Sequence, residues 1–134
     1  MAQMSDLLDK SDIWAIQEAS MATLQDIVDQ LGLRALTAGR GFEQVTPGAG
    51  YASDLLSCVM AGAQKKAVWV TLQAHANIVA VAALLDLSAI IITEGAMPDV
   101  ASIAKANEEG INLFSTPKPT FEVVGKLWEM GLRE

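Results

Sequence analysis

Apolar residues recur at two different spacings along the chain, and these spacings distinguish the predicted strands from the predicted helices. From residue 67 onward, short apolar runs alternate with segments of helical periodicity. The predicted strands are 67–72, 89–93 and 111–115, and the predicted helices are 78–86, 99–110 and 120–130. Strands that alternate with helices of this length indicate a mostly parallel sheet, and continuous apolar strands indicate a sheet covered on both faces. The sequence therefore predicts an α/β fold.

Small polar residues stand where these helices are expected to begin. Asn77, Asp99 and Thr120 are predicted helix caps, and Ser53 is predicted to cap a short helix through Met60. A longer amphipathic helix is expected from Asp12 to Leu31, where apolar residues recur at helical spacing and Gly32 follows. The predicted segments between these helices are a strand at 33–37, a second strand at 42–46 and a loop at 47–50.

The predicted helix 78–86 is apolar around its whole circumference, which is typical of a helix buried on every side. One face is expected to meet the sheet. The other needs a second cover, either the N-terminal helix or a second subunit, so we expect a homodimer as one of the two solutions.

Charge and composition exclude several classes of function. The 134 residues carry a formal net charge of −7. One lysine and six acidic residues give residues 1–30 a net of −5, so we treat 1–20 as an acidic extension and 21–134 as the domain. This balance argues against nucleic-acid binding. One Cys and one His argue against a disulfide framework or a metal cluster within one chain, and no cofactor is expected.

The chain shows no targeting signal and no membrane segment, so a cytoplasmic protein is expected. The acidic start lacks the basic region of a signal peptide, and the longest apolar run, 78–85, is too short to span a bilayer. Cys58 lies in an apolar run and is expected to be buried, which argues against a Cys–His pair with His75. The segment 48–53 resembles a dinucleotide-binding glycine motif but lacks the acidic residue about 20 positions later, so a turn is the better interpretation.

Three polar loops follow the three predicted parallel strands and are expected to meet at the carboxyl edge of the sheet. Short polar side chains followed by helix N-termini suit a small anionic ligand, although each residue alone is more simply explained as a cap or turn former. The candidate ligand-binding residues in these loops are Gln73, His75, Asn77, Thr93, Glu94, Gly95, Ser115 and Thr116.

Four runs of the sequence resemble a stand-alone DRTGG domain. The runs are Gly50–Ser57, Val68–Ala82, Ile90–Gly95 and Gly110–Thr116, and the resemblance covers about 21–134. The motif that names the family is incomplete: its Asp-Arg pair falls near Ala74-His75, and its Thr-Gly-Gly falls on Thr93-Glu94-Gly95. From the first run we add Tyr51, Ser53 and Asp54 to the candidate ligand-binding residues.

The resemblance has consequences for fold and function. DRTGG domains are similar to the N-terminal domain of HPr kinase/phosphorylase, which implies a three-layer α/β/α fold and a regulatory or oligomerising module. It does not imply kinase activity, because the chain has no P-loop motif.

Three hypotheses remain open at this stage. The first is a non-catalytic regulatory module that self-associates and binds a small anionic or nucleotide-like ligand at the carboxyl edge. The second is a small enzyme with Asp54, His75 and Glu94 as acid–base groups. The third is an adaptor whose N-terminal helix docks on a larger protein complex.

Overall fold

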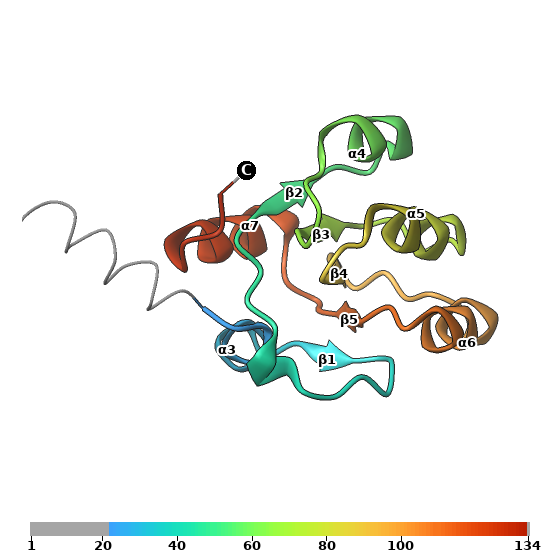
Figure 1. Ribbon diagram of the computed structural model, residues 1–134, viewed down its shortest axis with the longest axis horizontal. Helices are drawn as coiled ribbons and strands as arrows, with labels where there is room; N and C mark the ends of the chain where they lie inside the picture. The colour runs from blue at the N-terminus through green and yellow to red at the C-terminus, as the bar shows by residue number, and fades with distance from the viewer. Residues whose placement is uncertain (1–21, 134) are drawn as a thin grey trace, which may run out of the picture.

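The computed structural model describes residues 22–133, which form one five-stranded sheet with helices on both faces (Figure 1). The strand order is β1-β5-β4-β3-β2, and only β1 runs antiparallel to its neighbour. The elements are α3 (Leu24–Leu31), β1 (Arg34–Ala35), η1 (Phe42–Gln44), β2 (Gly50–Ala52), α4 (Leu56–Gly62), β3 (Val68–Thr71), α5 (Asn77–Leu85), β4 (Ala89–Ile92), α6 (Val100–Glu109), β5 (Leu113–Ser115) and α7 (Thr120–Glu129).

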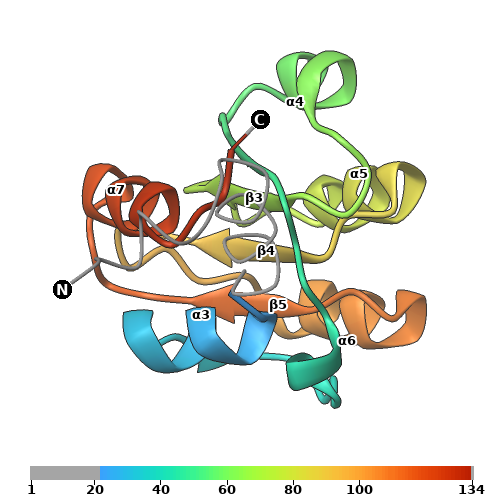
Figure 2. The ribbon, with the colours of Figure 1, turned by 60° about the vertical axis from the view of Figure 1, so that its left-hand side comes forward.

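The helices form the outer two layers of a three-layer arrangement. Helices α4, α5 and α6 cover one face of the sheet, and α3 and α7 cover the other (Figures 1 and 2). The central strands β3 and β4 are buried at every position, so their side chains alternate between two apolar clusters. Trp69 and Ile90 pack under α4–α6, whereas Val70 and Ile91 pack under α3 and α7. The predicted three-layer, mostly parallel α/β fold is confirmed.

Several helix boundaries confirm the sequence prediction. Asp99 is the N-cap of α6, and its carboxylate accepts a hydrogen bond from the Ser102 N–H at 2.8 Å. Gly110 and Gly32 end α6 and α3 in the left-handed conformation, with φ values of 71° and 63°.

Three other predicted caps are wrong by one or two residues. Ser53 lies before α4, whose N-cap position is Leu55, and the Ser53 hydroxyl accepts from the Leu55 N–H instead. Asn77 and Thr120 are the first residues of their helices and not the caps. The Asn77 side chain bonds to His75 in the preceding loop, and the Thr120 hydroxyl bonds to Thr93 at the end of β4, so neither side chain caps its own helix.

The segment between β1 and α4 differs most from the prediction. The expected strand at 42–46 is a short 3-10 helix, because Gly41 is left-handed (φ 72°) and turns the chain, and Phe42 packs edge-on against Phe114 with ring centroids 5.4 Å apart. The strand in this region is β2, which begins at Gly50, inside the predicted loop. Two glycines at 48 and 50 obscured it, since glycine is poorly represented in strands.

The predicted helix from Asp12 to Leu31 is interrupted. Thr23 has an extended backbone and forms a capping box with Asp26, so α3 begins at Leu24. The start of the predicted helix and the acidic extension lie outside the described residues.

Helix α5 is buried on one side only, which corrects the expectation of all-round burial. Ile78, Val79 and Ala82 are buried, but Leu84 is 70% exposed, since α3 packs on the opposite face of the sheet and cannot cover it. Within residues 22–133, no helix is long and apolar enough to cross a membrane.

Candidate functional site

The carboxyl ends of β2 and β3 are joined by a network around one carboxylate. Asp54 Oδ1 accepts hydrogen bonds from the Thr71 hydroxyl and from the Leu72 N–H, both at 2.8 Å. The Gln73 side chain donates to the Asp54 carbonyl at 3.2 Å, and the Gln73 N–H donates to the Thr71 hydroxyl at 3.0 Å. Asp54 and Gln73 therefore fix the ends of two strands to one another.

A second network joins β3 and β4 to the start of α7. The Thr93 hydroxyl is buried, lies 2.6 Å from the Thr120 hydroxyl and reaches the Thr71 carbonyl at 3.4 Å. Glu94 stands in the left-handed conformation (φ 61°), and its carboxylate accepts from the Thr120 N–H at 2.6 Å. Glu94 thus caps α7 from 26 residues away in sequence, which is the role that the sequence assigned to Thr120.

The remaining candidates on the β4 and β5 ends are also engaged in the fold. Ser115 and Thr116 are buried, and the Thr116 hydroxyl accepts from the Lys118 N–H at 3.2 Å. The Gly95 N–H donates to the Thr116 carbonyl at 3.1 Å. We name the residues that bond across the strand ends in these two networks the strand-end network: Asp54, Thr71, Gln73, Thr93, Glu94, Thr116 and Thr120.

Two further candidates, Tyr51 and Ser53, make contacts within the fold near β2. The Ser53 carbonyl accepts from the indole N–H of Trp69 at 2.8 Å. The Tyr51 ring packs against α4 so closely that a Cβ on Gly62 would lie 2.7 Å from it.

His75 and Asn77 lie in and after the loop that follows β3, and they bond to each other. The His75 Nδ1 contacts the Asn77 side-chain oxygen and accepts from the Asn77 N–H at 3.2 Å. Both residues are exposed. No hydrogen bond among residues 22–133 joins His75 to Asp54 or Glu94, and these two carboxylates are already bound to strand or helix ends. Cys58 is exposed as well, which corrects the expectation that it is buried.

An open cleft of about 550 Å³ lies at the same rim, between the loop after β3 and the start of α6. His75 comes from the first side of this cleft, and Asp99 and Lys105 come from the second. The α5–α6 cleft, as we name it, is lined by Ala74, His75, Ala76, Met97, Asp99, Ala101, Ser102 and Lys105.

The charges in the α5–α6 cleft are mixed. The hydrogen bonds from Ser102 lower the pKa of the Asp99 carboxyl, and the nearby His75 lowers it further, so Asp99 is anionic at neutral pH. Lys105 is half exposed and pairs with Glu109 one turn further along α6, at 3.5 Å. In residues 22–133 no group of three or more His, Cys, Asp or Glu side chains is placed to hold a metal ion.

Of the residues that line this cleft, the sequence predicts His75 as a candidate but not Lys105 or Ser102. Both residues lie within the helix that Asp99 was predicted to cap. Because a helix that follows a parallel strand begins at the carboxyl edge of the sheet, the position of this cap could have identified them.

Of the comparisons with known proteins, only the comparison of structures finds similar chains. No protein-family model and no curated protein match the chain. The chain is similar to the crystal structure of the CBS and DRTGG domains of the regulatory region of Clostridium perfringens pyrophosphatase complexed with an activator, diadenosine tetraphosphate. The TM-score is 0.66 at 23% identity, over 94% of this chain and 58% of the other. This likeness shows a shared fold, and the chain spans little more than half of that structure.

Proposed function

We propose that this protein is a regulatory domain of the DRTGG type that binds a small anionic, nucleotide-like ligand in the α5–α6 cleft. The likeness to a regulatory region that was crystallised with a nucleotide activator supports the class of function. The observation that carries the location is a difference between two parts of the carboxyl rim. Asp54, Gln73, Thr93, Glu94 and Thr116 are used by the strand-end network, whereas His75 and Lys105 line an open cleft.

The cleft offers the two kinds of group that such a ligand needs. The Lys105 ammonium can pair with phosphate or carboxylate oxygens, and the His75 ring can donate a hydrogen bond to them from the nitrogen that does not contact Asn77. Asp99 can accept a hydrogen bond from a hydroxyl or amino group of the same molecule. A molecule that carries both features, as a nucleotide does, fits this arrangement better than a simple anion, which Asp99 would repel.

A thermal-shift screen against nucleotides and phosphorylated metabolites tests the proposal. A ligand at 100 times its Kd stabilises the fold by about 2.7 kcal/mol, which raises Tm by several degrees in a domain of this size. Lys105→Ala is expected to abolish the shift. The matched control is Lys126→Ala, which removes an exposed lysine from α7, outside the cleft. A shift that survives Lys105→Ala and His75→Ala together contradicts the location.

Self-association is a second function that one surface favours. The outer side of α5 exposes Leu84 at 70%, and Met60 on the adjacent α4 is 49% exposed. Burying these side chains in a symmetric dimer would provide the second cover that the apolar sequence of α5 requires. Light scattering is expected to report a dimer that Leu84→Asp converts to a monomer, and a monomeric parent protein would contradict it.

A further inference from the structure

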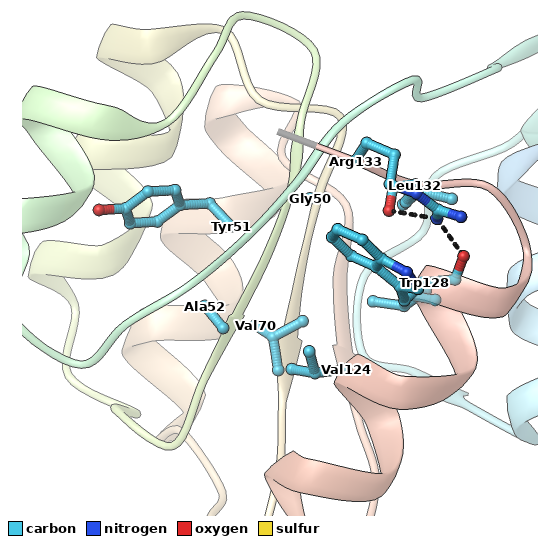
Figure 3. Close-up of a pocket in the computed structure, with 9 residues that line it drawn as sticks. Gly50, Tyr51, Ala52, Val70, Val124, Trp128, Leu132 and Arg133 are labelled. Atoms are coloured by element: carbon cyan, nitrogen blue, oxygen red, sulfur yellow. Dashed lines mark hydrogen bonds between the residues drawn. The ribbon is translucent and has the colours of Figure 1, made fainter.

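A second hollow, of about 340 Å³, lies between the edge strand β2 and helix α7, away from the α5–α6 cleft (Figure 3). Its floor is apolar: Val70 from β3, Val124 and Leu127 from α7, and Leu132 from the segment that follows α7. Trp128 and Arg133 form its rim, and the Arg133 guanidinium lies over the Trp128 ring at 4.1 Å. We name this feature the β2–α7 groove.

The apolar surface of the groove continues along α7. Phe121, Val124 and Trp128 are three and four residues apart, so they share one side of the helix. Phe121 is 92% exposed and Trp128 is 54% exposed. Two large aromatic side chains on one exposed helix face are typical of a surface that binds another apolar segment.

The strand that borders the groove is paired with Arg133 at the start of its outer edge, and this edge is open along Ala52. The bonds from the Val68 N–H to the Ala49 carbonyl and from the Ser53 N–H to the Val70 carbonyl assign alternate residues of β2 to β3. Gly50 and Ala52 therefore direct their backbone groups outward. The Gly50 N–H is met by the Arg133 carbonyl at 3.1 Å, but no strand continues along Ala52. An open edge of this kind is a site of unwanted pairing unless something covers it.

We propose that residues 1–21 of the same chain bind in the β2–α7 groove and cover the open edge of β2. The described chain begins at Ala22, which lines a shallow hollow together with Lys126, Glu129 and Met130 of α7. The preceding segment thus starts beside α7, one helix width of about 10–12 Å from the groove. Its 21 residues span about 30 Å as a helix and more when extended, so the segment reaches Phe121 in either form.

The composition of the segment matches the groove. It contains the apolar residues Ile13, Trp14 and Ile16, and it has four acidic residues and a single lysine. Arg133 at the rim has no acidic partner within salt-bridge distance among residues 22–133. Arg133 is therefore the cation that would attract the acidic segment, because Lys126 shares its hollow with the acidic residues Asp26 and Glu129.

Paramagnetic relaxation in the full-length protein tests the proposal directly. Cys58→Ser removes the single, exposed cysteine, and Ser11→Cys then carries a nitroxide label. Docking is expected to broaden the amide signals of Ala52, Val124 and Trp128 at least fivefold more than those of the α4–α6 layer. Uniform weak broadening over all surfaces within reach, or preferential broadening of α4–α6, would overturn the proposal.

Two further measurements keep the result unambiguous. Phe121→Asp is expected to abolish the selective broadening, whereas the matched control Val100→Asp, at a residue that is 84% exposed on α6, is expected to leave it unchanged. Selective broadening that survives Phe121→Asp contradicts the docking site. A mixture distinguishes binding within one chain from binding between two copies. It combines nitroxide-labelled protein without isotope labels and isotope-labelled protein without a nitroxide. Broadening of the groove signals in this mixture would assign the site to a second copy and contradict binding within one chain.

Discussion

The strand-end network and the α5–α6 cleft lie at the same rim of the sheet and both contain polar side chains, yet they differ in what these polar groups touch. In the network, Asp54 and Glu94 accept hydrogen bonds from backbone N–H groups at 2.8 and 2.6 Å. In the cleft, His75 and Lys105 are exposed and line an open space. Polar residues at the carboxyl edge of a parallel sheet are therefore candidates for ligand binding only where the fold has not already used them.

The largest expected effect that separates the two regions comes from Asp54. Asp54→Ala leaves the Thr71 hydroxyl and the Leu72 N–H without their shared acceptor, and we expect a loss of about 1.5 kcal/mol in the free energy of unfolding. Asp54→Asn retains one acceptor oxygen and should lose less. Urea unfolding with an unchanged m-value measures both variants. Equal stability of Asp54→Ala and the parent protein would mean that the network is not structural.

Glu94 belongs to the strand-end network and has two opposing effects on stability: its carboxylate caps α7, and its left-handed backbone is strained. Glu94→Ala removes the long-range cap of α7, at a cost of about 1 kcal/mol, and retains the left-handed backbone. Glu94→Gly loses the same cap but relieves about 1 kcal/mol of backbone strain, so it should unfold close to the parent protein. Denaturation midpoints of the pair decide the point, and an alanine variant as stable as the glycine variant would argue against strain at this position.

The cleft residues should behave in the opposite way. His75→Ala and Lys105→Ala each change the free energy of unfolding by less than about 0.5 kcal/mol, because both side chains are exposed and the Lys105–Glu109 pair is a surface ion pair. The same substitutions are expected to abolish the ligand-dependent shift in Tm. A loss of stability as large as that of Asp54→Ala would mean that these residues stabilise the fold, as the residues of the strand-end network do.

The smallest effect is a dependence on pH at Asp99. The bonds from Ser102 lower the pKa of this carboxyl in the folded protein. The carboxylate therefore stabilises the fold at pH values above its unfolded-state pKa of about 3.9. This contribution is lost as the pH falls through the lower pKa of the folded state. The free energy of unfolding of the parent protein should exceed that of Asp99→Asn at pH 5, and this difference should become smaller as the pH falls to 2. A difference that stays constant over this range would contradict the assignment.

The sequence predicted those parts of the fold that local signals specify. Strands β3 and β4 are uninterrupted apolar runs, and α6 begins and ends at residues that cap helices by themselves, Asp99 and Gly110. Strand β2 was missed, because its three residues include a glycine and its pairing depends on β3 and on Arg133, which are distant in sequence.

The candidate site was harder to predict for the same reason. The pattern placed Thr93 and Glu94 correctly at one edge, but their partners Thr71 and Thr120, and the carboxylate of Asp54 that bonds to Thr71, come from other elements. A single sequence cannot show which polar residues bond to each other across 17 to 27 positions, so it could not separate the network from the cleft.

The position of the bound ligand can be mapped by amide chemical shifts of the parent protein with the strongest nucleotide from the screen. We expect the largest shifts on the first turns of α5 and α6, at Asn77–Val79 and Val100–Ile103, while β2 and the end of α7 remain unchanged. Saturable shifts confined to the β2–α7 groove, with none at the α5–α6 cleft, would contradict this expectation.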